Sequence, residues 1–355
     1  MQTDIIIVGQ GISGTFLSYY LQKAGVPFIV IDESKPNTAS KAAAGLINPV
    51  TGRRIVKTWM IDELMSFAKE AYAEIGKELG IDFFSATSII DFFPTPQMRH
   101  AFLQRLNEDK EFLELPDDED SWSTHFNYDF GFGKIEPVYL VSIAKLIEAF
   151  RKKLLDQSNL LEDCFDIQQL VLLENKIQYK DIIAQKIIFC DGVESFQNPF
   201  FKNLPFAPNK GEALLVEIKD IPDDLIYKKG INLVPLGDHL FWVGSSYEWQ
   251  FQDNQPTEIF RKRTELNLLD WVKAPLKIME HFASVRPATL ERRPFVGFHP
   301  LNKSIGILNG MGTKGCSLAP YFANQLVENS VRQKPIDASA DINRFEKTLG
   351  RSAIS

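Results

Sequence analysis

The chain has 355 residues, of which 45% are hydrophobic and 24% are charged, and its formal net charge at pH 7 is −7. This composition is typical of a folded globular protein and excludes a disordered or fibrous chain, while the length allows about two domains. The negative charge gives no overall attraction to nucleic acid or to an anionic membrane, so such contacts would depend on local clusters such as Arg53 with Arg54 and residues 261–263.

The three cysteines, Cys164, Cys190 and Cys316, lie far apart, and none belongs to a C-x-x-C pair. This spacing supports neither a zinc site nor a disulfide framework, so we expect no metal and reduced thiols. The N-terminus lacks the pattern of a signal peptide, and glycine and polar residues interrupt the apolar stretch of residues 5–21. We therefore expect a cytoplasmic protein without a membrane span.

The first predicted unit is a strand, a tight turn, a helix and a second strand. Residues 5–8 are an unbroken apolar run, and apolar residues then recur at helical spacing up to Ala24. Gly25 stands where a helix commonly ends, and residues 28–31 form a second apolar run that stops before Asp32. Together these segments predict one βαβ unit.

Three further helices are predicted from apolar residues at helical spacing. The first covers residues 58–79 and stops at Gly80, the second runs from Pro137 to about residue 155, and the third covers residues 318–331 with Pro320 in its first turn.

Short strands are predicted between these helices and before the last one. The expected strands lie at residues 167–173, 176–179, 187–190 and 305–308. Residues 212–249 look like antiparallel strands separated by turns that contain Pro235 and Gly237 with Asp238. The pattern predicts an α/β nucleotide-binding domain made of separated segments, with a second, antiparallel domain inserted between them.

The pattern G-x-G-x-x-G occupies residues 9–14, directly after the first predicted strand and at the start of the first helix. Gly9 allows a tight turn, Gly11 lets the backbone approach a pyrophosphate, and Gly14 lets the helix pack closely on the strand. Asp32, 18 residues after Gly14, ends the second strand, where a carboxylate can accept hydrogen bonds from a ribose. These features predict a dinucleotide site.

Both FAD and nicotinamide cofactors use such a turn, and two later segments favour FAD. The small residues at positions 40–46 would let the backbone lie against a large planar ligand, although a plain turn has the same composition. The glycine-rich residues 309–315 precede the last helix, so backbone donors and a helix N-terminus can face a flavin, unless these glycines serve only the helix entry.

These motifs resemble the FAD-dependent oxidoreductases of the D-amino-acid oxidase type, most closely the glycine oxidases and the oxidase half of the bifunctional enzyme that modifies the tRNA wobble uridine. The matching segments are residues 4–32, 40–49, 186–192, 209–211 and 284–320. The resemblance implies a Rossmann-like FAD-binding domain of discontinuous segments (1–80, 135–205 and 285–355). It also implies an inserted substrate domain with an antiparallel or mixed sheet (81–134 and 206–284).

The resemblance also implies which residues contact the cofactor. They are Gly9, Gly11, Ile12, Ser13, Gly14, Asp32, Glu33, Ser40, Ala44, Gly45, Leu46, Ile167, Asp191, Gly192, Gly310, Gly312, Thr313 and Lys314. Some relatives attach flavin to a cysteine near the position of Arg286, where this chain has none, so noncovalent FAD is expected. Cys316 is expected to be a buried residue at the start of the last helix.

In such enzymes an arginine at the position of Arg286 holds the substrate carboxylate, and a second basic residue, here Lys314, assists it. A lysine offers a point charge instead of the planar fork of a guanidinium. Asn232 falls where relatives often have a tyrosine, and Tyr247 is a second candidate for the pocket wall. Packing or ion pairing alone would also account for each of these residues. We assign no role to His239, His281 and His299, and expect Arg292 and Arg293 to be solvated.

The activity implied is oxidation of the C–H bond next to an amine in an amino acid or related secondary amine, with hydride transfer to flavin N5. The expected partner is thus a small amine. One alternative is a carboxymethylaminomethyl-type uridine in tRNA, with Arg53, Arg54, Lys57 and residues 261–263 on phosphates. This alternative requires the basic residues to share one surface. A flavin-binding protein without turnover and a nicotinamide dehydrogenase are further alternatives.

Overall fold

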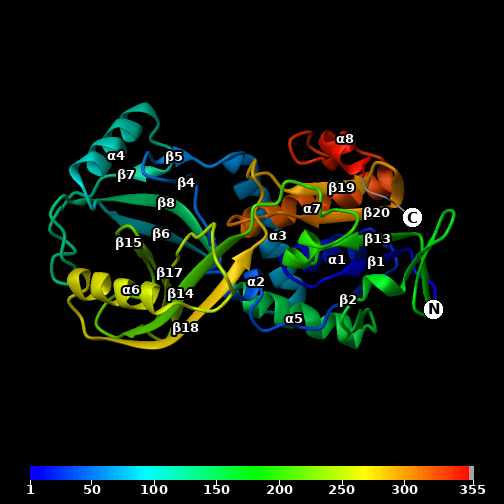
Figure 1. Ribbon diagram of the computed structural model, residues 1–355. Coiled ribbons are helices and arrows are strands. Elements are labelled where there is room, and N and C mark those ends of the chain that lie inside the picture. The colour runs from blue at the N-terminus through cyan, green and yellow to red at the C-terminus, as the bar shows by residue number, and fades with distance from the viewer. Residues whose placement is uncertain (352–355) are drawn as a thin grey trace.

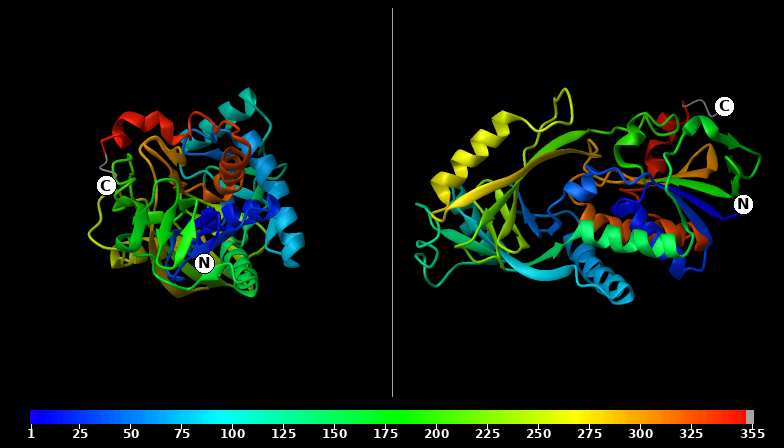
Figure 2. Two further views of the ribbon diagram at one scale, coloured as in Figure 1. Left: turned by 90° about the vertical axis from the view of Figure 1, so that its right-hand side faces the viewer. Right: turned by 90° about the horizontal axis from the view of Figure 1, so that it is seen from below.

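The computed structural model describes residues 1–351 and has two lobes side by side (Figure 1, Figure 2). One lobe is built on a six-stranded sheet and contains the N-terminus and the last described residues; the other is built on a nine-stranded sheet. This arrangement confirms the expected α/β fold class. No helix in the described residues has the length and hydropathy needed to cross a lipid bilayer.

The predicted βαβ unit is confirmed. Strand β1 (Ile5–Val8) pairs in parallel with β2 (Phe28–Ile31), and α1 (Ile12–Lys23) connects them. Gly25 has the positive φ of +67° expected just past a helix end, and its N–H donates to the carbonyl of Gln22. The short connection from Gly25 to β2 then returns the chain to the sheet.

The six-stranded sheet is parallel except at one edge. Its order is β19 (Phe295–His299), β20 (Asn302–Asn309), β13 (Lys186–Phe189), β1, β2 and β9 (Leu160–Leu161). Only β19 runs antiparallel to its neighbour. Because β1, β13 and β20 are parallel, the loops that follow them meet at the same edge of the sheet.

Both faces of this sheet are covered, which explains the continuous apolar runs of its strands. Ile5 and Ile7 face the core that contains α1 and α7 (Gly315–Arg332), whereas Ile6 and Val8 face a second core. The second core includes a small antiparallel sheet made of β10 (Leu170–Leu172), β11 (Ile177–Tyr179) and β12 (Ile182–Ala184). Residues 167–169 form a 3₁₀ turn instead of the expected start of a strand.

The nine-stranded sheet is antiparallel except where β15 runs parallel to β6. Along its main path the order is β18 (Leu276–Arg286), β14 (Asn209–Ile218), β17 (Leu240–Gly244), β16 (Asn232–Gly237), β15 (Ile226–Lys228), β6 (Phe84–Phe92), β8 (Phe132–Val141) and β3 (Leu46–Ile47). Strand β7 (Leu113–Glu114) also pairs with β8, and β4 (Val50–Thr51) forms a separate hairpin with β5 (Val56–Lys57).

The two faces of the nine-stranded sheet belong to different cores. Leu233 of β16 faces the core beneath α6 (Glu258–Trp271), whereas its neighbour Val234 faces the large core that also contains α1, α3 (Ile61–Leu79) and residues of α4 (Pro96–Glu108). We call these the α6 face and the inner face of the sheet. The inner face is therefore the one turned toward the first lobe.

Two prolines lie in strands and not where the sequence analysis placed them. Pro137 belongs to β8, and the helix expected to begin there is α5 (Ile143–Asp156). Pro235 belongs to β16 instead of a turn. The pairing register shifts beside each proline, and such bulges tolerate a residue without an N–H donor.

The last long helix also differs from the prediction. Helix α7 begins at Gly315, three residues earlier than expected, so Pro320 lies inside the helix and not in its first turn. A proline at position 320 cannot donate to the carbonyl of Cys316. The hydroxyl of Tyr72 in α3 donates to that carbonyl at 2.8 Å. A contact between helices thus replaces the missing helical bond, and Cys316 is buried at the helix start as expected.

The expected domain boundaries are crossed by two strands. Strand β8 spans the boundary at residue 135 and β18 spans the one at residue 285, while β3, within the expected FAD-binding segment 1–80, pairs with β8 in the nine-stranded sheet. The division stays a prediction, and residues 352–355 of its last segment lie outside the described residues. The remaining helices are α2 (Ala39–Ala42), α8 (Glu346–Leu349) and the 3₁₀ turns Gly192–Phe196 and Ile342–Phe345.

We predict that Gly45→Ala lowers the free energy of unfolding by about 2 kcal/mol or more, because the residue has a φ of +79° and the new Cβ would lie 1.8 Å from the carbonyl oxygen of Val141. Gly52→Ala is the matched control, since its φ is +77° but nothing lies within 4 Å of the new Cβ. Its cost should be about 1 kcal/mol. Equal losses in denaturant unfolding would contradict the prediction.

Candidate active site

The glycine turn between β1 and α1 is closely packed on neighbouring backbone. A Cβ on Gly9, whose φ is +93°, would lie 2.6 Å from the carbonyl oxygen of Cys190, and a Cβ on Gly14 would lie 2.0 Å from that of Gly9. Gly11 caps α1 without a side-chain hydrogen bond. In the first turn, the N–H of Ile12 donates to Ser40 Oγ at 3.1 Å. The turn thus presents a helix N-terminus whose N-cap residue makes no side-chain bond, and such an N-terminus favours an anion.

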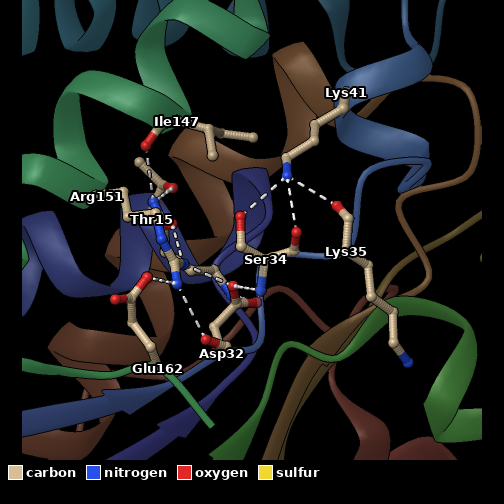
Figure 3. Close-up of polar contacts among 9 residues, drawn as sticks. Thr15, Asp32, Ser34, Lys35, Lys41, Ile147, Arg151 and Glu162 are labelled. Atoms are coloured by element: carbon tan, nitrogen blue, oxygen red, sulfur yellow. Dashed lines mark hydrogen bonds and ion pairs between the residues drawn. The ribbon is translucent and has the colours of Figure 1, made fainter. Parts of the chain in front are cut away.

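Asp32 lies at the end of β2 beside this turn, as expected, and its carboxylate is held from three sides (Figure 3). Oδ2 accepts the N–H of Gln10 at 2.9 Å, while Oδ1 accepts the N–H of Ser34 at 2.8 Å and Arg151 Nη1 at 2.7 Å. A carboxylate has about four acceptor positions, so one position on Oδ2 is left for a hydroxyl donor.

Arg151 is a residue of this site that the sequence analysis missed. It reaches from α5 between Asp32 and Glu162, whose Oε1 lies 3.0 Å from Nη2 (Figure 3). It also donates to Gln10 Oε1 at 3.3 Å. Residue 151 is 119 positions from Asp32, so no local pattern could have linked the two. Glu33, the next expected residue, instead pairs with Lys35 at 2.9 Å.

The loops after β13 and β20 are joined by one amide. Asn309 Nδ2 donates to the carbonyl oxygen of Gly192 at 2.8 Å, to Ser195 Oγ at 2.9 Å and to Asp191 Oδ1 at 3.3 Å. The hydroxyl of Ser195 donates to the same Asp191 oxygen. Burial raises the pKa of the Asp191 carboxyl to about 7. Asp191 and Gly192, expected at the cofactor, thus lie in an internal network that shapes the glycine-rich residues 309–315, which we call the late glycine loop.

The late glycine loop turns into α7 beside the end of β18. Gly310 and Gly312 have φ values of +79° and +55°, and the N–H of Gly312 donates to the carbonyl of Pro287 at 3.1 Å. Helix α7 has no side-chain cap at Lys314. The loop thus brings a second uncapped helix N-terminus to the residues that follow Arg286.

Lys314 lies in a positively charged part of this loop. Burial, and then the nearby Arg293 and Arg292, lower the pKa of its amino group. Within residues 1–351, no hydrogen bond or ion pair holds this amino group. Arg292 is exposed as expected, but Arg293 is not simply solvated, because its guanidinium stacks on the ring of Trp59 at 4.0 Å from the centroid.

The other expected cofactor residues differ in burial and in their place in the fold. Ala44 and Leu46 flank Gly45, and Leu46 is the first residue of β3. Ser13 is buried in α1, Thr313 is exposed in the late loop, and Ile167 packs on the core of the opposite sheet face. Two bonds join the segment around α2 to the inner face of the nine-stranded sheet: Trp242 Nε1 donates to the carbonyl of Ala42 at 3.1 Å, and Ser284 Oγ to that of Asn37 at 3.2 Å.

Arg286 ends β18 and carries a charge without a carboxylate partner. Nη1 donates to Asn209 Oδ1 at 2.5 Å and Nη2 to Ser245 Oγ at 2.7 Å, and the guanidinium also faces the carbonyl of Ser246. A Cβ on Gly211 would lie 1.8 Å from Nη2, so this glycine makes room for the guanidinium. Among residues 1–351 no Asp or Glu lies within ion-pair distance of it. Burial of the guanidinium, which removes part of its hydration, lowers its pKa.

Asn232 and Tyr247 both lie near Arg286. Asn232 contacts residues 244–247, and Tyr247 belongs to this segment. Asn232 Nδ2 donates to the carbonyl of Gly244 at 3.3 Å, next to Ser245. The ring of Tyr247 lies 5.6 Å from the Arg286 guanidinium and is 48% exposed. Residues 244–247 therefore bring these three expected residues together, and the contact of Gly312 with Pro287 places the loop of Lys314 beside them.

Of the three histidines to which no role was assigned, His281 differs from the expectation. His281 does have a carboxylate partner, because its Nε2 lies 3.0 Å from Glu212 Oε2. The pair packs against α6, since the ring of His281 stacks on Phe260. It therefore lies on the sheet face turned away from Arg286. His299 is buried, which lowers its pKa to about 4, and His239 is an exposed partner of Asp223.

The basic clusters do not form one surface. Lys57 in β5 pairs with Asp62 at 2.9 Å and with Glu111 at 2.7 Å, so two carboxylates balance its charge. Residues 261–263 lie in α6, which covers the α6 face, while the β4–β5 hairpin lies on the other side of the nine-stranded sheet (Figure 1). The structure therefore does not bring these two groups of basic residues onto one surface.

Comparison with known proteins gives a consistent result. The model of the family described as FAD dependent oxidoreductase (DAO) matches residues 4–329. Glycine oxidase from Pseudomonas aeruginosa is 21% identical over 95% of this chain and 97% of its own length. The structure of glycine oxidase from Bacillus cereus has a TM-score of 0.78 at 15% identity, covering 99% of both chains. That of iminodiacetate oxidase from a Chelativorans species has a TM-score of 0.76 at 18% identity, covering 96% and 98%.

The residues at the edge of the six-stranded sheet fit FAD. Two helices without side-chain caps begin there, and a Cβ on Gly9 or Gly14 would collide with backbone. Asp32 keeps one free acceptor position toward a ribose hydroxyl. Gly11 and Asp32 would therefore hold the pyrophosphate and ribose sides, and the start of α7 would face the flavin.

We predict that Arg151→Met raises the dissociation constant of FAD about 5- to 10-fold, because Asp32 loses the charged donor that orients it. Fluorescence titration of the apoprotein with FAD measures the constant. Lys23→Met is the matched control, since it removes an exposed pair between Lys23 of α1 and Glu74 of α3. An unchanged constant in Arg151→Met would show that Asp32 needs no orienting partner.

We predict that Asp191→Asn removes a pH-dependent loss of stability. The folded pKa of about 7 lies above the ordinary value of 3.8, so folding favours the protonated carboxyl. Its stabilising contribution is complete below pH 3.8 and is lost as the pH rises toward 7. The variant should therefore gain stability relative to the wild type between pH 4 and 8, by about 2 to 4 kcal/mol. Denaturant unfolding of both proteins at pH 4 and pH 8 measures this difference. An equal change in the free energy of unfolding of variant and wild type between the two pH values would contradict the prediction.

Proposed function

Because the chain belongs to the DAO family of FAD-dependent oxidoreductases, we propose that it oxidises the C–H bond next to the nitrogen of an amino acid or a related secondary amine. Bound FAD supplies the acceptor for the hydride, and water would hydrolyse the resulting imine. The nitrogen must be neutral for this reaction, and no side chain has to act as a strong acid or base. The protein then contributes binding, orientation and positive charge.

The observation that carries the proposal is the unbalanced charge of Arg286. A partly buried cation is costly unless an anion accompanies it. No carboxylate within residues 1–351 plays that part, while Asn209 and Ser245 fix the orientation of the guanidinium. A planar fork held in this way suits a carboxylate. The names of the glycine oxidases and of iminodiacetate oxidase support an amine that carries a carboxylate.

The neighbouring residues would complete the substrate site. Asn232 would offer its amide to the amine or carboxylate, and the half-exposed ring of Tyr247 would cover the guanidinium from the solvent side. Lys314, whose pKa is lowered by burial and by Arg293, would add positive charge beside the start of α7. Such charge stabilises negative charge that develops in the site.

A small amine is favoured over modified tRNA. The basic residues that would contact phosphates lie on opposite sides of the nine-stranded sheet, and two carboxylates neutralise Lys57. A bound polynucleotide needs one continuous positive surface. The other alternative, a flavin-binding protein without turnover, is decided by the experiment that follows.

We predict that glycine, sarcosine, D-alanine or D-proline bleaches the flavin of the purified holoenzyme under anaerobic conditions. Arg286→Met should lower kcat/KM for that amine about 10²- to 10³-fold, because two charged hydrogen bonds to the carboxylate are lost. Arg286→Lys should recover only part of the loss, since a lysine cannot bind as a fork.

Stopped-flow measurement of flavin reduction gives these rates, and Arg261→Met is the control, because this arginine is exposed in α6, on the other face of the sheet. A flavin that none of the amines bleaches would favour the protein without turnover. Full activity in Arg286→Met would remove the carboxylate from the proposal.

A further inference from the structure

A row of polar residues crosses the inner face of the nine-stranded sheet on three adjacent strands. Asn232 of β16 pairs in register with Lys228 of β15, which pairs with Asp91 of β6. The side chains two residues away on the same strands, Val234, Ile226 and Ile89, all belong to the large core between the lobes. Because side chains alternate along a strand, the polar row faces the same side.

The row leads directly to the surroundings of Arg286. Asn232 pairs with Gly244, whose carbonyl accepts the Asn232 amide, and the next residue, Ser245, accepts a hydrogen bond from Arg286. Adjacent strands are about 4.8 Å apart, so the backbone of Lys228 lies about 10 Å from that of Gly244. The ammonium of Lys228 lies at Asp91 on the next strand, so it marks the end of the row that is farther from Arg286.

Lys228 and Asp91 form an ion pair on the inner face of the sheet. Their Nζ and Oδ2 atoms lie 2.7 Å apart, with the Asp91 side chain 0% exposed and that of Lys228 17% exposed. Ile89 and Ile135 border the pair on the same face. Apolar side chains of similar size commonly fill such a place at no loss of stability, because burying two charges is costly.

The pair is also incomplete. Asp91 Oδ1 is buried and has no hydrogen-bond partner among residues 1–351. The ammonium of Lys228 has three donors, and Asp91 is the one partner found for it in that part of the chain. The accessible member of the pair is thus the cation, held from below by a fully buried carboxylate.

We propose that Lys228, held in place by Asp91, is a second anion contact of the substrate site, so that the preferred substrate is an amine with two acidic groups. This inference rests on the proposed function, in which Arg286 takes the first carboxylate. Lys228 takes the second one, on the far arm of a secondary amine, and Asn232 lies between the two charges. Asp91 is a positioning residue, since it acts through Lys228.

The test compares matched amines on the holoenzyme. N-carboxymethyl derivatives of glycine, β-alanine and 4-aminobutyrate carry the second carboxylate at increasing distance, and the corresponding carboxamides have the same shape without the charge. The wild type should prefer at least one dicarboxylate over its carboxamide by about tenfold or more in kcat/KM, mainly through KM. Lys228→Met should bring this ratio close to 1.

Lys229→Met is the matched control, because Lys229 follows Lys228 but lies near Asp270 of α6 on the other face. Its ratio should equal that of the wild type. Asp91→Asn should lower the ratio and make it more sensitive to salt, since the lysine is then charged but not held. The double variant Asp91→Leu/Lys228→Met removes both charges and thus keeps the experiment decisive if a single variant does not fold.

The outcomes separate the two proposals. A wild-type ratio near 1 for all three pairs, or a ratio that survives in Lys228→Met or in the double variant, would overturn the second anion contact while amine oxidation itself stands. If no amine reduces the flavin, the proposed function fails. In that case, binding of glutarate and of its half-amide is measured from changes in the flavin spectrum. Tighter binding of glutarate would still support the contact at Lys228, and equal binding would overturn it.

Discussion

The structure depends on the close approach of the glycine turn to the end of β13. A Cβ on Gly9 would lie 2.6 Å from the carbonyl of Cys190, so only a glycine allows β1 and β13 to end side by side as parallel neighbours. Asn309 then joins the loop after β13 to the loop after β20. Three loops from distant parts of the chain therefore meet at one edge of the sheet, where two helices begin without side-chain caps. Anion binding at this edge follows from the backbone more than from charged side chains.

Strand β14 has a different role on each of its faces. Gly211 leaves space for the Arg286 guanidinium on one face. On the α6 face, the Glu212 carboxylate accepts the N–H and hydroxyl of Thr257, while its backbone pairs with Ser246. The segment that carries Tyr247 is thus attached at both ends to the strand that accommodates the arginine. The geometry of the site follows from alternation along one strand, and packing beneath α6 stabilises it from behind.

The sequence allowed the βαβ unit and the carboxylate at its second strand to be predicted, because each rests on local spacing. It did not reveal Arg151, which lies 119 positions from the carboxylate that it orients. Pro137 was misplaced, because a strand bulge tolerates a proline as well as a helix start does, and only the pairing of β8 with β6 decides between them. The order of strands across the nine-stranded sheet is equally non-local, so the juxtaposition of Asp91 and Lys228 was not predictable.

The site is positive in a protein whose net charge is negative. Arg286 has no acidic partner among the described residues, and Arg292 and Arg293 add to the field at Lys314, where burial and these neighbours lower the pKa. The net charge of −7 is therefore spread elsewhere on the surface. Surface charges are screened within about 10 Å, whereas partly buried charges such as those of Arg286 and Lys314 are screened much less. The electrostatic character of this site therefore depends on where a few cations lose their hydration, and not on the overall charge.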